Sequence, residues 1–230
     1  EALVFTAVML TANAIAYLGK AIDNGNSHFS LLILASVFIY GILAYVFKSR
    51  LIWAFVLISL GAWFGTETGY LSRWNWYFVG MNYPLRFVLF GLCLTAFSFI
   101  IKDNKKMGIF FQVNYVCGMV YLFVSLWLLS VFGNFGSLEE WYSVKQLSLF
   151  YWGILSAAFC LISIYIGLKY RDDIAREFGI TFLFINLYTR YFEYFWDSWH
   201  KALFFCVLAA SFWFIGRRAE KIWNLEFLKK

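Results

Sequence analysis

Four polar residues share one face of a stretch that is otherwise apolar. Within residues 177–199, EFGITFLFINLYTRYFEYFWDSW, a helix would place Asn186, Arg190, Glu193 and Asp197 in a sector roughly 60° wide. A charge inside a bilayer costs about 2.5–3.5 kcal/mol on insertion scales, so such residues face a protein interior or a wet cavity and find partners there. A fixed cation beside titratable carboxylates could bind a substrate or an ion, or relay protons.

Two further charges stand at the ends of apolar stretches. Glu67 closes one stretch and Arg86 opens the next, on the side where Asp197 is also expected. We expect Glu67, Arg86, Arg190 and Glu193 to form a self-neutralising pocket that faces the outer side. The alternative is that Glu67 and Arg86 mark where two helices leave the membrane, and that Arg190 and Glu193 form a structural ion pair.

The remaining chemistry-bearing residues do not form a motif. His28 and His200 come from separate segments, and we expect them at the membrane interface rather than on a metal. All four cysteines fall inside apolar stretches without CxxC spacing, so neither a disulfide framework nor a metal site is predicted. No glycine-rich nucleotide loop, GxSxG or HExxH occurs, so no cofactor is expected and an enzyme is disfavoured.

Composition identifies the elements that position these residues. The chain has 230 residues, of which 63% are hydrophobic and 14% are charged, with a mean hydropathy of +0.71. A soluble domain has about 25% charged residues, so we predict an all-α, polytopic transmembrane helical bundle. Continuous apolar stretches favour helices over a barrel. About eight spans are predicted, at residues 2–19, 29–47, 51–65, 85–101, 108–132, 147–168, 177–197 and 202–216. The third and eighth are short. The segment 133–146 is predicted to contain a short surface helix capped by Ser137.

Basic residues give the orientation. In an eight-span arrangement, 13 Lys and Arg residues fall on one side and four on the other. The positive-inside rule then places both termini in the cytoplasm. The expected location is a bacterial inner membrane, and a nucleic-acid partner is excluded because no basic domain exists. We also expect cytoplasmic residues upstream of Glu1, because apolar sequence begins at residue 2.

A weak internal repeat accompanies this arrangement. Residues 86–106 align with 201–221. Three phenylalanines of one segment align with phenylalanines of the other, and both segments end in basic residues. The second and sixth spans end alike, in KSR and KYR. The whole chain is predicted to be one transmembrane domain, whose halves 1–106 and 107–230 would be two parallel four-helix repeats. Chance similarity between phenylalanine-rich spans is the alternative.

Several segments resemble a known family. LGAWFGTETGY (60–70), NYPLRF (82–87) and NLYTRYFEYFWD (186–197), followed by an apolar span and RRAEK (217–221), are similar to bacterial multi-span membrane proteins that carry a domain of unknown function. The match is concentrated in the last 50 residues. It implies architecture and location but no chemistry. The motif positions that it implies are Arg190, Tyr191, Phe192, Phe195, Trp196 and Asp197.

Three functions therefore compete. The first is a transporter-like or ligand-binding membrane protein in which Arg190 anchors an anion and Glu193 and Glu67 titrate. The second is a non-catalytic subunit or scaffold, whose partners would be other membrane subunits or a second copy of the chain. The third, an enzyme acting on a lipid-linked substrate, ranks last because no nucleophile or metal set accompanies the carboxylates. All three place the chain in a lipid bilayer.

Overall fold

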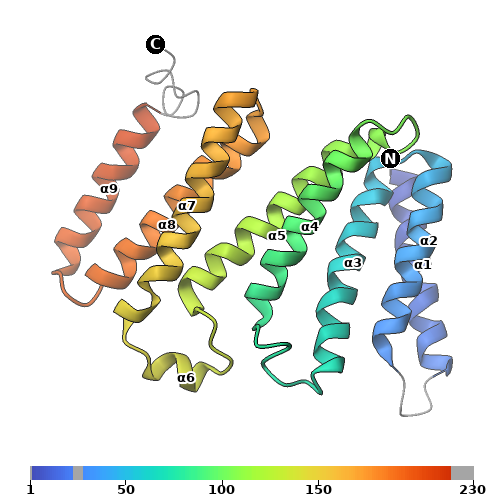
Figure 1. The fold of residues 1–230 in the computed structure, drawn as a ribbon, viewed down its shortest axis with the longest axis horizontal. Coiled ribbons are helices and arrows are strands. Elements are labelled where there is room, and N and C mark those ends of the chain that lie inside the picture. The colour runs from blue at the N-terminus through green and yellow to red at the C-terminus, as the bar shows by residue number, and fades with distance from the viewer. Residues whose placement is uncertain (1, 23–27, 219–230) are drawn as a thin grey trace. The chain divides into compact units, whose positions relative to one another are not determined.

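The structure is a computed structural model that describes residues 2–22 and 28–218. These residues fold almost entirely into helices, and no strand forms among them beyond an isolated bridge between Phe78 and Met81. Figure 1 shows the order of the helices. The helices are α1 (Ala2–Ile22), α2 (Phe29–Phe47), α3 (Arg50–Leu71), α4 (Tyr83–Lys102), the 3-10 turn η1 (Gly108–Phe110), α5 (Phe111–Phe132), α6 (Leu138–Ser143), α7 (Gln146–Tyr170), α8 (Asp173–Phe195) and α9 (Lys201–Arg217).

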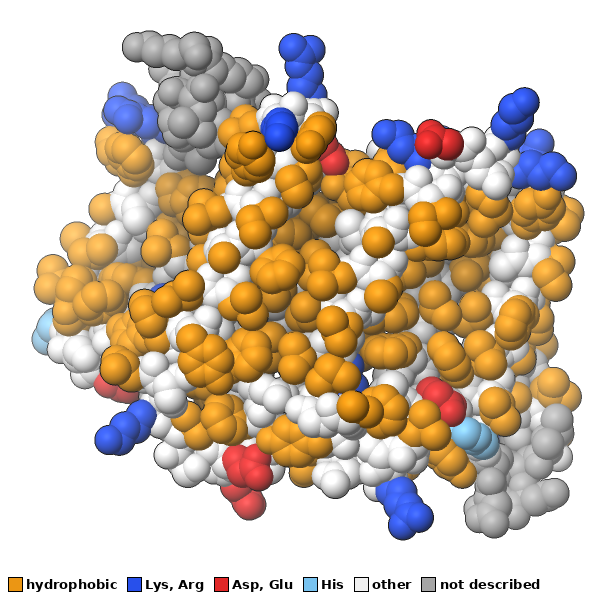
Figure 2. Space-filling model, in the orientation of Figure 1, with side chains coloured by type: hydrophobic (Ala, Val, Ile, Leu, Met, Phe, Trp, Pro, Cys, Tyr) orange, Lys and Arg blue, Asp and Glu red, His pale blue; other side chains and the backbone are white. Residues whose placement is uncertain are grey.

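Six helices of the described chain are long and apolar enough to cross a membrane, namely α1 to α5 and α7. This is the make-up of a multi-pass helical membrane protein, as the sequence predicts. Hydrophobic side chains cover most of the visible face, and Lys and Arg side chains stand mainly at helix ends (Figure 2). Helices also form at the seventh and eighth predicted spans, but α8 carries five charged residues and α9 has only 17 residues.

Two predicted boundaries need comment. The third span was expected to end near residue 65, but α3 continues to Leu71. The hydroxyls of Thr66 and Thr68 bond to the carbonyls of Ala62 and Phe64 in the same helix, at 2.6 and 2.8 Å, so polar residues there do not end it. The predicted surface helix is α6, and its first turn is capped because Glu140 N donates to Ser137 Oγ at 3.1 Å.

The described chain divides into two compact units, and the division runs through α5. Unit 1 comprises residues 1–126 and 134–141, and unit 2 comprises residues 127–133 and 142–230. In unit 1 the helices approach closely at Gly91 of α4, where an added Cβ would lie 2.4 Å from the backbone nitrogen of Leu122 in α5. Small residues at such crossings are typical of helices packed in membranes.

Asn114 of α5 ties three helices of unit 1 together. Its side chain is fully buried, and its amide donates to the Leu94 carbonyl at 3.0 Å and to Ser98 Oγ at 2.9 Å, both in α4. Its oxygen accepts from Trp53 Nε1 of α3 at 3.3 Å. The amide therefore satisfies its polar atoms inside an apolar core, which is the packing role expected for an intramembrane asparagine.

The tight turns of the two units are built alike. Lys48 ends α2 and Arg171 ends α7, each in the left-handed region with φ of 50° and 55°. The following residues, Ser49 and Asp172, cap the next helix by accepting a hydrogen bond from the backbone nitrogen three residues later. Each turn thus reverses the chain within about two residues and holds a basic side chain at its bend.

Candidate functional site

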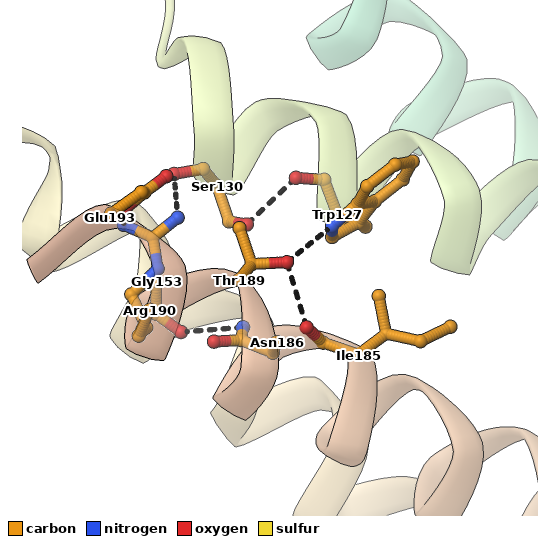
Figure 3. A network of polar contacts seen from close by, with 8 residues as sticks. All are labelled: Trp127, Ser130, Gly153, Ile185, Asn186, Thr189, Arg190 and Glu193. Carbon is orange, nitrogen blue, oxygen red and sulfur yellow. Dashed lines mark hydrogen bonds and ion pairs between the residues drawn. The ribbon is translucent and has the colours of Figure 1, made fainter. Parts of the chain in front are cut away.

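The Arg190 guanidinium lies inside unit 2, where α5, α7 and α8 supply its neighbours (Figure 3). Its Nη2 donates to the Ser130 carbonyl at the end of α5, at 2.8 Å. Its Nη1 lies 2.6 Å from Glu193 Oε2, one turn further along α8. Gly153 of α7 packs beside the side chain, and a Cβ there would lie 3.5 Å from Arg190 Cδ, an ordinary van der Waals distance. Arg190 is thus held by three helices of one unit.

Burial makes this ion pair energetically important. Only 13% of the Arg190 side chain and 20% of the Glu193 side chain are exposed. Two isolated charges at this depth would lose most of their hydration, whereas an adjacent pair with a carbonyl partner recovers much of that loss. The predicted pairing of Arg190 with Glu193 is therefore formed, and its net charge is zero.

Two polar side chains extend the network towards the middle of α8. Asn186 is buried, and its amide donates to the Gly153 carbonyl at 3.1 Å. Thr189 accepts a hydrogen bond from Trp127 Nε1 at 2.9 Å and donates to the Ile185 carbonyl at 2.7 Å. The polar face of α8 predicted from the sequence thus packs against α5 and α7 (Figure 3).

Asp197 does not join this network. It follows the end of α8 at Phe195, its side chain is exposed, and none of the ion pairs in the described chain includes it. The helical projection placed it on the Arg190 face, but the helix has ended before Asp197 is reached. Asp197 is accordingly an exposed residue beyond the end of α8.

Glu67 has partners of its own in unit 1. Its Oε2 accepts a hydrogen bond from Ser30 Oγ at 2.5 Å and lies 3.3 Å from His28 Nε2. The His28 ring stacks on Tyr70 with 3.6 Å between centroids. These contacts fasten the start of α2 to the end of α3. Within the described residues, no three His, Cys, Asp or Glu side chains gather as they would around a metal ion.

Arg86 is a buried cation that is held by oxygen atoms without charge. Its side chain is 1% exposed, and it donates to the carbonyls of Met81 at 2.9 Å and Trp76 at 2.8 Å. It also bonds to Thr68 Oγ1 at 3.3 Å, and its guanidinium lies 4.4 Å from the centroid of the Tyr83 ring. These contacts anchor the loop between α3 and α4.

The expected association of Glu67 with Arg86 is therefore wrong. In the described part of unit 1, no carboxylate lies within ion-pair distance of the Arg86 guanidinium. The physical reason is helix rotation: Arg86 meets Thr68, and Glu67, one residue earlier on α3, points about 100° away. The contacts described for Glu67 and Arg86 lie within unit 1, and those described for Arg190 and Glu193 lie within unit 2.

A groove lies between α8 and α9 in unit 2, next to the ion pair. It encloses about 590 Å³, which is in the range of small-molecule sites. The two helices are joined by hydrogen bonds from Tyr191 to the Phe204 carbonyl at 2.9 Å and between the hydroxyls of Tyr188 and Ser211 at 3.0 Å. The groove is lined by Phe184, Leu187, Tyr188, Arg190, Tyr191, Tyr194, Phe195, Val207, Leu208, Ser211, Phe214 and Ile215.

Two of the groove residues carry polar atoms without a hydrogen-bond partner. These atoms are the Tyr194 hydroxyl and Arg190 Nε, both buried, and Arg190 Nη1 contacts Glu193 without hydrogen-bond alignment. A buried donor without a partner costs about 1–3 kcal/mol. The groove therefore has largely apolar walls, and two residues that line it, on neighbouring turns of α8, each carry an enclosed donor without a partner.

Sequence reasoning missed the groove and the α5 and α7 contributions to the site. Ser130 and Gly153 carry no distinguishing signal, since both act through their backbone carbonyls. Tyr194 could have been noticed, because it follows Arg190 by four residues and so projects about 40° from it on a helix.

The chain was compared with known proteins in three ways. No protein-family model matches it. No curated protein matches it. No solved structure matches it.

Proposed function

We propose that the chain is an eight-span membrane protein that binds a hydrophobic small molecule in the groove between α8 and α9, beside the Arg190–Glu193 pair. The observation that carries this proposal is the groove of about 590 Å³, which is lined by Arg190 and Tyr194, two residues that each enclose a donor without a partner. Ligand sites combine apolar walls with a few convergent polar groups, as this groove does. Intramembrane charges also mark functional sites by default.

An internal duplication supports eight spans. In this duplication α8 and α9 are the counterparts of α3 and α4, and α3 and α4 are apolar and long enough to cross a membrane. The α2–α3 and α7–α8 hairpins correspond at a spacing of 123 residues, as from Lys48 to Arg171. The positions buried in both hairpins are Ser30 and Gly153, Tyr40 and Ser163, Ala44 and Gly167, Ile52 and Ala175, Val56 and Gly179, and Leu57 and Ile180.

The same spacing relates the two charges. Glu67 corresponds to Arg190. The residues that contact them, Ser30 in the case of Glu67 and Gly153 in the case of Arg190, also correspond. The spacing is 8 residues longer than the 115 that relate 86 to 201, and 6 of these 8 come from the loop after α3 (72–82), which is longer than the loop after α8 (196–200). We take the repeats to be parallel four-helix halves.

Location follows from charge. Basic residues occupy the α2–α3 turn, the α4–α5 connection, the α7–α8 turn and the segment after α9. By the positive-inside rule, this supports cytoplasmic placement of both termini. We place the protein in the inner membrane of a bacterium, in keeping with its resemblance to bacterial membrane proteins with a domain of unknown function.

The subunit hypothesis is the second candidate. It requires that a partner helix satisfy the polar face of α8. Arg190 instead bonds to Ser130 and Glu193, and Asn186 bonds to Gly153, all in unit 2. These contacts within unit 2 leave less of the polar face of α8 for a partner helix to satisfy, which favours ligand binding over a scaffold role.

The proposal is tested by a substitution that fills the groove with a larger side chain. Leu208→Trp places an indole in the groove, and Leu203→Trp is the matched control, because Leu203 is an exposed α9 residue that does not line it. Small molecules that copurify with the detergent-solubilised protein are measured by native mass spectrometry. We expect a bound molecule in the parent protein and in Leu203→Trp, and its loss in Leu208→Trp. Equal retention by all three proteins would refute the proposal.

A further inference from the structure

We propose that the groove between α8 and α9 binds one acyl chain of a membrane glycerophospholipid, with the ester carbonyl of that chain accepting a hydrogen bond from Tyr194. This inference rests on the proposed function and names its ligand. It follows from the charge, the depth and the walls of the groove.

The charge of the site favours an uncharged acceptor. Arg190 is already neutralised by Glu193 at 2.6 Å, so the groove does not offer a free cation to a phosphate. The groups without partners are donors, on Tyr194 and on Arg190 Nε. A neutral carbonyl oxygen meets this need without adding a charge to the pair, whereas an anion would compete with Glu193.

The depth of the donors matches that of an ester. Tyr194 lies one residue before the end of α8, and Arg190 lies about 7–8 Å below that end at 1.5 Å per residue. Trp196 and Trp199 follow immediately, as in the aromatic belt of a membrane interface. The interfacial layer of a bilayer is only about 5–8 Å thick on each side, and it contains the ester groups. The donors and the esters therefore occupy similar levels.

The walls suit a hydrocarbon chain. Leu187, Val207 and Phe214 line the groove and also expose a large part of their surface, so the groove opens on an apolar face of unit 2. For a multi-pass membrane protein, that face is covered by lipid. The Tyr194 hydroxyl is enclosed when the groove is empty, so we infer that its ring turns towards the groove when a chain enters. Relief of the unmet hydroxyl favours that movement.

The test compares two lipids that differ only at the ester. Native mass spectrometry in detergent measures the Kd of phosphatidylcholine with ester-linked chains and of its ether-linked counterpart, which lacks the carbonyls. We expect the parent protein to bind the ester lipid roughly threefold to tenfold more tightly, the value of one neutral hydrogen bond. Tyr194→Phe should abolish this preference. Tyr165→Phe, a change at an exposed position of α7, should retain it.

Other outcomes overturn the inference. Equal affinity of the parent protein for ester and ether lipids would remove the carbonyl contact, while groove-dependent binding in the Leu208→Trp test would leave the proposed function standing. Tighter binding of phosphatidylglycerol than of phosphatidylcholine would point to an anion site. Tighter binding of an isoprenoid quinone would replace the lipid as the ligand.

Discussion

Removing the Glu193 carboxylate while keeping Arg190 tests the buried ion pair most severely. In Glu193→Leu the guanidinium, 13% exposed, keeps the Ser130 carbonyl but loses its counter-ion. Breaking a fully buried pair costs about 3–5 kcal/mol, and the residual exposure here lowers the expected loss in the free energy of unfolding to about 2–3 kcal/mol. Arginine stays charged inside proteins, so it cannot relieve this loss by releasing a proton.

The opposite single change should be milder. In Arg190→Met the Glu193 carboxyl can take up a proton, so we expect a loss of about 1–2 kcal/mol. The double variant carries neither charge and should lose only about 1–2 kcal/mol, which leaves a coupling free energy of about 2 kcal/mol between the two positions. The assay is reversible unfolding in mixed detergent micelles, followed by circular dichroism.

A second double-mutant cycle, at another ion pair of α8, serves as the control. Asp173 and Arg176 lie 2.8 Å apart at the start of α8, but Asp173 is 71% exposed. The Arg176 side chain is 12% exposed, but water reaches the Asp173 carboxylate freely, and an i,i+3 pair with an exposed partner is worth about 0.3–0.5 kcal/mol, so the Asp173→Asn and Arg176→Gln changes should be nearly additive. If Arg190→Met and Glu193→Leu were equally additive, the pair would not be the buried unit described above.

Two further predictions concern unit 1 and use the same unfolding assay. Gly91→Ala should lower the free energy of unfolding by about 1–3 kcal/mol, because the new methyl group would lie 2.4 Å from the backbone nitrogen of Leu122. The control Gly41→Ala has open space around the new methyl group and should raise the free energy of unfolding by up to about 1 kcal/mol. Equal effects would refute the close approach of α4 and α5. Arg86→Gln should cost about 2 kcal/mol or more and expose the α3–α4 loop to proteolysis, because the buried guanidinium holds the Trp76 carbonyl; an unchanged loop would contradict that anchoring role.

Local patterns made much of the fold predictable. Apolar length alone located all eight long helices, and the spacing of three between Arg190 and Glu193 predicted their contact. The cap at Ser137 followed from a similarly local signal. Each of these features depends on residues within one or two helical turns, so the sequence contains the information directly.

Contacts between distant segments were not predictable in the same way. The Ser130 carbonyl is 60 residues from Arg190, and any residue type could have supplied it. The grouping of Glu67 with Arg86 failed because their positions near helix ends were known from the sequence but the rotation of α3 about its axis was not. The groove depends on how α9 packs against α8, and an apolar sequence does not specify that packing.

The central claim is that the groove between α8 and α9 holds a molecule beside Tyr194 and Arg190. A crystal structure of the protein grown in a lipidic phase tests this claim most directly. The account predicts elongated electron density along Val207 and Phe214 that ends within hydrogen-bond distance of the Tyr194 hydroxyl. A groove closed by direct packing of α9 on α8, with no such density, would contradict it.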